Sequence, residues 1–150
     1  MSNIVNAFKQ AFKRAKEKNW DSMYVLIDMH GTIFKPSYLE EETYEYYPYV
    51  KEVMRILNDW YYTSKGDMNV VCILWTSTTR DAGKEYIERM KEDGIRFDYV
   101  NENPEVNRQE TDPKSSSFDD KFYFNVGLDD KFGFDPDKDW KKIYDYLITL

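Results

Sequence analysis

Apolar residues follow two different spacings along this chain, and the two alternate from one end to the other. In some segments they recur every three or four residues, which is the spacing of an amphipathic helix. In others they form short uninterrupted runs, which are typical of strands buried on both faces of a parallel sheet. The predicted helices cover residues 3–18, a segment opened by Pro48, residues 81–93 and residues 137–148, and the predicted strands cover 23–27, 68–75, 97–100 and 122–128.

The order of these elements predicts the fold class. Strands that alternate with helices indicate right-handed βαβ crossovers and a parallel sheet with helices on both faces. We therefore predict an α/β fold with three α/β/α layers around a mostly parallel, Rossmann-like sheet. The short stretch between Thr32 and the helix that follows Pro48 leaves room for a minimal cap domain at most.

The N-terminal segment differs in character from the rest of the chain. We predict a basic amphipathic helix within residues 1–20 and one further domain in residues 21–150. Phe8 and Phe12 share a face of this helix, while lysine and arginine occupy much of the remainder. Such a helix can lie on a membrane or on a partner protein. We favour the alternative that its phenylalanine stripe packs on the chain's own domain.

Composition and charge narrow the classes of function. The chain has 150 residues, of which 41% are hydrophobic, and this fits one globular domain. Its net charge of −7 disfavours nucleic acid and anionic membranes as general partners, although a local basic patch could still bind either. Cys72 is the only cysteine, which excludes an intrachain disulfide and fits a reducing compartment. No apolar run reaches the roughly 20 residues of a membrane span, so we predict a cytoplasmic protein.

Polar residues follow three of the predicted strands at the points where the strands end. The first strand ends in Asp28, the second is followed by Thr76, and the fourth is followed by Asp129. In a parallel sheet, ligands bind outside these carboxyl ends. Carboxylates from two strand ends repel each other unless a cation lies between them, and oxygen ligands suit Mg²⁺, which commonly bridges to phosphate. The pattern predicts a site for phosphoryl transfer, at which an aspartate can act as the nucleophile.

Four motifs occur in the order found in the haloacid dehalogenase (HAD) superfamily of phosphohydrolases. VLIDMHGTI resembles the first motif of that superfamily, hhhDxDGT, in which h is apolar, apart from the second aspartate. ILWTS resembles the second motif, Lys121 stands in the place of the third-motif lysine, and GLDDKFGFD resembles the fourth, acidic motif. The resemblance covers about residues 22–150 and is greatest to small phage and bacterial members with little or no cap domain.

The resemblance implies a metal-binding role for several of these residues. It makes Asp28 the nucleophile and a ligand of Mg²⁺, and it makes the backbone carbonyl of His30 a second ligand. Asp129 would hold the metal through its carboxylate or through water, and Asp130 is the alternative or helper carboxylate. Thr32 would fix the turn after the first strand through its hydroxyl group.

The resemblance also implies which residues hold the phosphoryl group. Thr76 and Lys121 would bind it, although Lys114 could reach in from the same polar loop in place of Lys121. The candidate residues for binding the rest of the substrate are Thr32, Ser77 and Arg80.

His30 stands where the sequence departs from the superfamily's pattern. The second aspartate of the first motif is the superfamily's general acid and base, and here a histidine occupies its place. Imidazole can do acid–base work at neutral pH. Alternatively, hydrolysis is slowed, as in P-type ATPases, which have threonine here and keep a longer-lived aspartyl-phosphate. A third alternative is that the histidine is an introduced substitution.

The sequence therefore predicts a Mg²⁺-dependent, HAD-like phosphatase that acts on a small phosphomonoester or a nucleotide. The acidic net charge favours a small substrate, which the polar loop of residues 101–120 would have to cover. An open site leaves a nucleic-acid end or a phosphoprotein as alternatives. The rival prediction, from another class, is a catalytically impaired binding or regulatory protein that kept the HAD fold.

Overall fold

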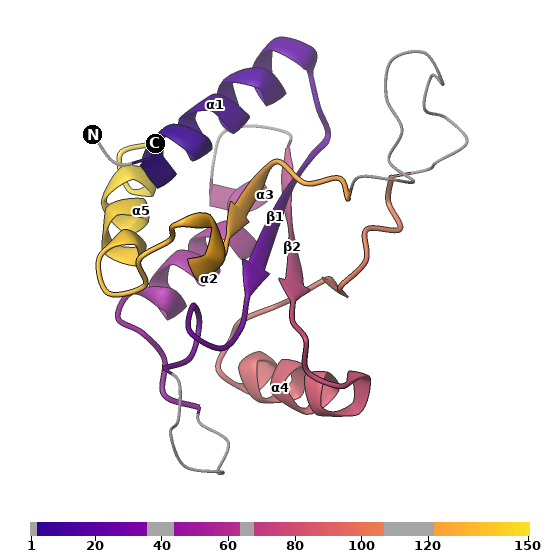
Figure 1. Cartoon of the computed structure of the whole chain (residues 1–150). Helices are drawn as coiled ribbons and strands as arrows, with labels where there is room; N and C mark the ends of the chain where they lie inside the picture. Colours follow the sequence, from indigo (N-terminus) through magenta and orange to yellow (C-terminus); the bar gives the residue numbers. More distant parts are fainter. Residues whose placement is uncertain (1–2, 36–43, 64–67, 107–121) are drawn as a thin grey trace.

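Four parallel strands form one sheet that runs through the middle of the molecule (Figure 1). The computed structural model describes residues 3–35, 44–63, 68–106 and 122–150. In this part of the chain the strands lie in the order β3, β2, β1, β4, and each neighbouring pair is parallel. Their bounds are Ser22–Asp28 for β1, Asn69–Trp75 for β2, Tyr99–Val100 for β3 and Val126–Leu128 for β4.

The helices lie close to where the apolar spacing predicts them. The predicted helix after Pro48 is two helices, and the first begins only at Val50 because Tyr49 has a left-handed φ of 71°. Gly94 follows the end of α4 with a φ of 83°, a conformation that favours glycine. None of the described helices is long and apolar enough to span a membrane. The bounds are Asn3–Lys18 for α1, Val50–Asn58 for α2, Trp60–Thr63 for α3, Arg80–Glu92 for α4 and Asp139–Leu147 for α5.

The main core lies between the helices and one face of the sheet. Val25 of β1 is fully buried there, together with Met54 of α2 and Trp140 of α5. Phe8 of α1 and Tyr86 of α4 belong to the same cluster. Figure 1 shows α1, α2 and α5 on the same side of the sheet. The phenylalanine stripe of α1 thus packs on the chain's own core, since Phe8 has no exposed surface.

The other face of the sheet has a smaller apolar cluster. Leu26 of β1 and Ile73 of β2 are buried there. Phe122 and Phe124, which precede β4, pack against them. β3 and β4 lie at opposite edges of the sheet. The chain thus has the predicted α/β class, an all-parallel Rossmann-like sheet in a three-layer arrangement.

The two edge strands are shorter than their apolar runs predict. The predicted strand 122–128 is reduced because Asn125 pairs with Tyr24 through its side chain, whose Oδ1 accepts a hydrogen bond from the Tyr24 amide at 2.7 Å. Asp98 does the same at the other edge, where its Oδ2 accepts from the Cys72 amide at 2.9 Å. In both places a side-chain oxygen replaces a backbone carbonyl, and the regular ladder starts one residue later.

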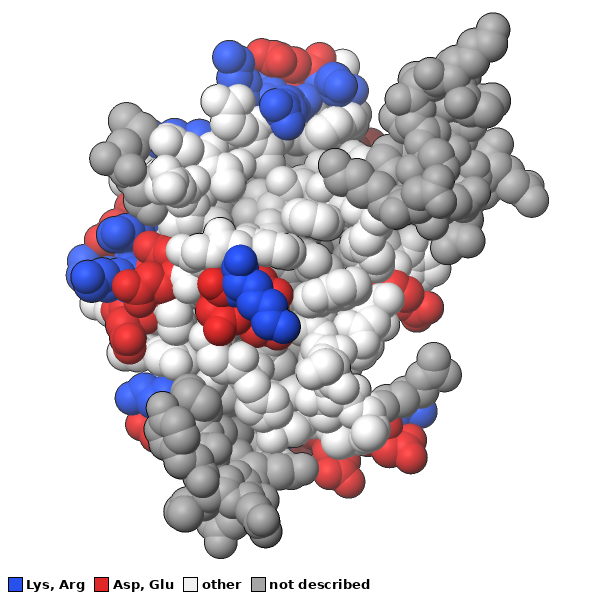
Figure 2. All heavy atoms as spheres, viewed as in Figure 1, with Lys and Arg blue, Asp and Glu red and all other residues white. Residues whose placement is uncertain are grey.

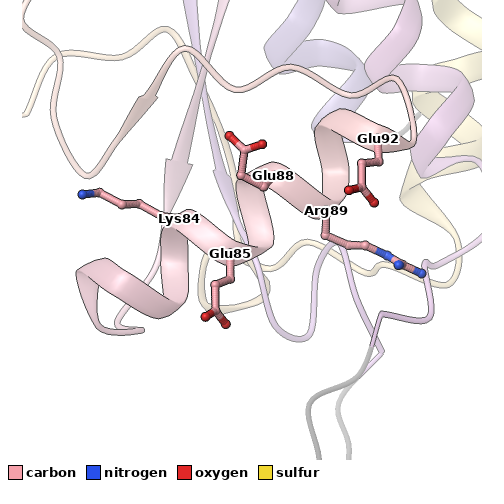
Figure 3. A pocket seen from close by; sticks show the side chains of 5 residues that line it. All are labelled: Lys84, Glu85, Glu88, Arg89 and Glu92. Atoms are coloured by element: carbon pink, nitrogen blue, oxygen red, sulfur yellow. The ribbon is translucent and has the colours of Figure 1, made fainter.

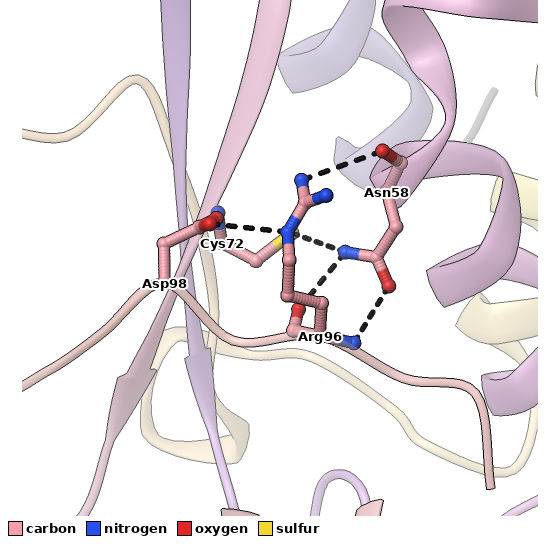
Figure 4. Close-up of polar contacts among 4 residues, drawn as sticks. All are labelled: Asn58, Cys72, Arg96 and Asp98. Carbon is pink, nitrogen blue, oxygen red and sulfur yellow. Dashed lines mark hydrogen bonds and ion pairs between the residues drawn. The ribbon is translucent and has the colours of Figure 1, made fainter. Parts of the chain in front are cut away.

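A hydrogen-bonded group holds Asp98 in position at the edge of the sheet (Figure 4). The Nε atom of Arg96 lies 3.1 Å from Asp98 Oδ1. The Asn58 side chain, at the end of α2, accepts from the Arg96 amide and donates to the Arg96 carbonyl, both at 2.9 Å. Burial raises the pKa of the nearby Cys72 thiol to about 12, so this cysteine is an unreactive core residue.

Candidate functional site

Three carboxylates meet at the carboxyl ends of β1 and β4. Asp28 is the last residue of β1, and Asp129 and Asp130 follow β4 directly. Each offers one oxygen, and these three oxygens all lie within 4.8 Å of one another. The two strands pair in parallel with Ile27 opposite Leu128, so the residues that follow these two are brought to the same edge. Asp28, Asp129 and Asp130 together form the carboxylate cluster.

The turn after β1 fixes the Asp28 carboxylate. The hydroxyl group of Thr32 donates a hydrogen bond to Asp28 Oδ2 at 3.3 Å. Thr32 has no exposed surface, and its carbonyl accepts a hydrogen bond from the indole nitrogen of Trp140 at 2.7 Å. A buried contact from α5 therefore positions the residue that in turn orients Asp28.

Gly31 allows this turn to pass close to the carboxylate cluster. Its φ is +81°, which L-residues rarely adopt, and its amide donates to the Phe34 carbonyl at 2.9 Å. A Cβ atom at this position would lie 3.6 Å from Asp130 Oδ2. The backbone of the turn and the Asp130 carboxylate thus face each other.

The pKa values of Asp28 and Asp129 are both raised. Burial, and then the charge of Asp129, raise the pKa of Asp28 from 3.8 to about 6, against the hydrogen bonds from the Met29 amide and Thr32. Burial is also the largest cause of the raised pKa of Asp129, although the Lys131 amide donates to Asp129 Oδ1 at 2.9 Å. Three oxygen donors that repel one another in this way fit the ligand chemistry of Mg²⁺, which would relieve the repulsion.

His30 extends from the same turn toward α4. Its Nε2 atom lies 3.1 Å from the hydroxyl oxygen of Tyr86, and the two rings are nearly perpendicular with centroids 5.1 Å apart. The His30 side chain is exposed, whereas Tyr86 is only 2% exposed. The histidine that replaces the expected aspartate is thus anchored at one ring nitrogen to a buried phenol.

Thr76 lies at the end of the neighbouring strand. Its position follows Trp75, which pairs with Asp28 in the sheet. Its hydroxyl group donates to Thr78 Oγ1 at 2.9 Å and accepts from the Thr78 amide at 3.1 Å. The side chain of Asn101 accepts from the Thr76 amide and donates to the Thr76 carbonyl, both at 2.8 Å. The Thr76 hydroxyl therefore lies in a tight turn, and Asn101, the residue after β3, holds the backbone of that turn by two hydrogen bonds.

The remaining predicted site residues differ in how the structure places them. Ser77 is exposed in the turn after Thr76. Arg80 is the first residue of α4, but its side chain lies outside the described residues, as does the whole of Lys121. The structure thus brings together Asp28, Thr32, Asp129 and Asp130 and places Thr76 directly after the neighbouring strand β2.

The sequence did not reveal three residues that build the site. Helical spacing within residues 81–93 and 137–148 indicates only that Tyr86 and Trp140 face inward, and their polar contacts depend on how these two helices pack against the turn after β1. Asn101 follows the short third strand, so the rule applied to the other strand ends would have found it. Its left-handed φ of 53° suits asparagine.

The outer surface of α4 carries a hollow of about 420 Å³, and no residue of the carboxylate cluster lines it. Figure 3 shows the charged side chains around it pointing in different directions from the helix. Positive and negative residues share this face, and no group of donors or acceptors converges on one point. It is a solvated helix surface. The residues that line it are Lys84, Glu85, Glu88, Arg89 and Glu92.

Comparison with known proteins supports the fold. No family model matches the chain, and no curated protein sequence matches it. A solved structure of a conserved protein from Bacteroides thetaiotaomicron is similar, with a TM-score of 0.57 and 22% sequence identity over 85% of this chain and 91% of that one. At this identity the likeness shows a shared α/β fold and carries no information about activity.

Proposed function

We propose that this protein is a Mg²⁺-dependent, HAD-like phosphatase that acts through an aspartyl-phosphate on Asp28. Its substrate is a small phosphomonoester or a nucleotide. The observation that carries the proposal is the carboxylate cluster, whose oxygens lie within 4.8 Å of one another at two adjacent strand ends. The motif VLIDMHGTI, which ends one of those strands, supports the same assignment.

The cluster would hold the metal ion. Asp28 and Asp129 would be carboxylate ligands with Asp130 beside them, and the His30 carbonyl would be a ligand by resemblance to the HAD motif. When bound, Mg²⁺ supplies positive charge that offsets the carboxylates and the phosphate oxygens.

Asp28 would act as the nucleophile. Its pKa of about 6 leaves it mainly ionised at neutral pH, and the Thr32 hydroxyl group holds one of its oxygens in place. The carboxylate attacks phosphorus, a new oxygen–phosphorus bond forms, and the bond to the leaving oxygen breaks. Water then attacks the phosphorus of the aspartyl-phosphate, which releases phosphate and restores Asp28.

His30 would supply and accept the protons of the two steps. The leaving oxygen requires a proton in the first step, and the attacking water loses one in the second. The Tyr86 hydroxyl oxygen would accept a hydrogen bond from Nε2–H, which leaves Nδ1 as the nitrogen that exchanges protons. The imidazolium would donate its Nδ1 proton to the leaving oxygen, and the neutral ring would then accept a proton from the attacking water at Nδ1.

The rival function is a binding or regulatory protein that kept the fold and lost turnover. The contact between His30 and Tyr86 also favours this function. A histidine that contacts a buried tyrosine through one ring nitrogen cannot rotate freely toward a substrate. Both functions use the carboxylate cluster, so they differ only in whether His30 transfers protons.

A turnover assay tests the proposal. Phosphate release is measured from sugar phosphates and from mono- and dinucleotides, with and without Mg²⁺. We expect Mg²⁺-dependent turnover that Asp28→Asn abolishes and that Asp145→Asn, an exposed control on α5, leaves unchanged. Turnover that survives Asp28→Asn would rule out the mechanism.

A second variant separates the two functions. His30→Asp restores the acidic residue, and a general acid and base contributes roughly 10²- to 10⁴-fold to such reactions. Turnover close to that of wild type supports proton transfer by His30. A gain of that size over an inactive wild type supports a protein that lost turnover together with its acid–base group. No turnover in either protein, with Mg²⁺ still bound, supports a binding role.

A further inference from the structure

A cleft lies at the opposite end of the sheet from the carboxylate cluster, between α1 and the segment that leads into β4. Its volume is about 570 Å³, within the range of small-molecule sites. Trp20, which lines it, precedes β1, and Asn125, also in the lining, pairs with Tyr24 near the start of that strand. Asp28 stands at the strand's other end. The α1 cleft is thus separate from the proposed phosphatase site.

The helix side of the α1 cleft is positively charged. Arg14 and Lys18 line it from the same face of α1, one turn apart. Both are exposed, and neither makes an ion pair within the described part of the chain. Ala11, one turn earlier, also lines the cleft and leaves space below the two cations. In Figure 2, basic and acidic atoms lie side by side at the top, where Figure 1 draws the end of α1, and uncharged atoms lie beneath them.

Trp20 is fixed beside these cations by the way α1 ends. Asn19 has a left-handed φ of 53°, and the Trp20 amide donates to the Ala15 carbonyl at 3.0 Å, as in a Schellman motif. The Lys18 ammonium group lies 5.7 Å from the centre of the Trp20 ring. The helix end therefore places a cation and a partly exposed aromatic ring side by side.

The sheet side of the α1 cleft adds a second ring and a hydrogen-bond donor. Tyr123 stacks edge-on against Tyr24, with ring centres 5.7 Å apart, which fixes its ring at the cleft wall. The Asn125 side chain uses Oδ1 to accept from the Tyr24 amide. Its Nδ2 donates no hydrogen bond among the described residues, so it is free to donate to a ligand.

We propose that the α1 cleft binds a mononucleotide. Arg14 and Lys18 would bind the phosphate, and the base would lie against Trp20 and Tyr123. Inorganic phosphate would use only the cations, and a nucleoside only the rings. The net charge of −7 opposes a long polyanion, which favours a single nucleotide over a nucleic-acid strand.

Isothermal titration of the full chain with adenosine 5′-monophosphate tests this proposal. EDTA is present, so that metal-dependent binding at the carboxylate cluster does not contribute. We expect saturable binding that the double variant Arg14→Gln/Lys18→Gln weakens about 10-fold or more, since it removes both positive charges that would bind the phosphate. Lys13→Gln/Lys16→Gln removes the same charge from α1 outside the cleft and is expected to change the Kd less than about twofold.

Trp20→Ala isolates the aromatic contribution. Stacking of a base on an aromatic side chain contributes about 1–3 kcal/mol, so this variant should raise the Kd of the nucleotide about 5- to 150-fold. It should leave the weaker binding of ribose 5-phosphate unchanged. Every substituted side chain is at least partly exposed, so we expect each variant to fold. Thermal melts of each variant check this.

Three results would overturn the proposal. The first is no saturable binding at millimolar nucleotide. The second is equal binding by wild type and Arg14→Gln/Lys18→Gln, with loss of binding in Asp28→Asn, which would place the nucleotide at the carboxylate cluster instead. The third is tighter binding of a thymidine oligomer than of the mononucleotide, which would assign the cleft to nucleic acid. Failure of the phosphatase proposal alone would leave nucleotide binding in EDTA unaffected.

Discussion

The indole nitrogen of Trp140 donates a hydrogen bond to the Thr32 carbonyl at 2.7 Å, across 108 residues of the chain. Both residues are fully buried. Thr32 in turn donates to the Asp28 carboxylate, so α5 sets the orientation of the proposed nucleophile through one intermediate residue. This chain of contacts links the stability of the fold to the geometry of the site.

The first prediction concerns that buried hydrogen bond. Trp140→Phe keeps an aromatic ring but leaves the Thr32 carbonyl without its donor and leaves a small void. We expect the free energy of unfolding to fall by about 2–4 kcal/mol, from the lost hydrogen bond and the void together. Denaturant unfolding measures this. The half-buried Trp75 provides a matched control, and a Trp75→Phe variant that loses as much stability as Trp140→Phe would contradict the account.

The sequence predicted the middle of the sheet better than its edges. The apolar runs of β1 and β2 are long because both strands are buried on both faces, and this pattern is visible without a structure. At the edges, Asn125 and Asp98 use side-chain oxygens in place of backbone carbonyls. Hydrophobic spacing carries no signal for such an exchange, so the predicted strands were too long.

The candidate site could likewise be predicted only in part from the sequence. Asp28 and Asp129 could be placed together from the sequence, because parallel pairing brings the carboxyl ends of strands to one edge. The contacts of His30 with Tyr86 and of Thr32 with Trp140 depend on how α4 and α5 pack against the turn. Spacing along one helix predicts that such residues face inward, but not which polar group they meet.

The second prediction concerns the pH dependence of stability without metal. The pKa of Asp28 is raised from 3.8 to about 6 in the fold, so folding favours its protonated form. This contribution is fully present below pH 3.8 and is lost as the pH rises through 6. Allowing for partial exposure, we expect wild type in EDTA to lose about 1–2 kcal/mol relative to Asp28→Asn between pH 4 and pH 7.

Unfolding curves of the two proteins at a series of pH values measure this difference. Comparing wild type with Asp28→Asn cancels the carboxyl groups outside the carboxylate cluster, which titrate alike in both. A difference that stays constant over this interval would show that burial and the neighbouring charges do not raise the pKa of Asp28 in the folded protein.

The third prediction concerns Mg²⁺ and the role of Asp129 as a ligand. Asp129 is 6% exposed and accepts from the Lys131 amide, so Asp129→Asn keeps the turn while removing a ligand charge. We expect its thermal stabilisation by Mg²⁺ to disappear while the metal-free protein stays folded. Asp129→Ala should also lose the capping hydrogen bond, which costs about 1 kcal/mol more.

The matched control for this comparison is Asp137→Asn, an exposed aspartate beyond the carboxylate cluster. It should keep the full Mg²⁺ response. Equal stabilisation of wild type and Asp129→Asn by Mg²⁺, measured as the shift in melting temperature, would remove Asp129 from the ligand set.

The fourth prediction concerns the contact between His30 and Tyr86. Tyr86→Phe keeps the ring that packs on His30 but removes the hydroxyl group 3.1 Å from Nε2. If His30 transfers protons in a fixed tautomer, the variant should lower kcat several-fold with little change in KM, because the site still binds substrate. In a His30→Asp background the same change should have little effect, since no imidazole remains to be oriented. A double-mutant cycle on kcat measures the coupling, and equal losses in both backgrounds would reduce Tyr86 to a packing residue.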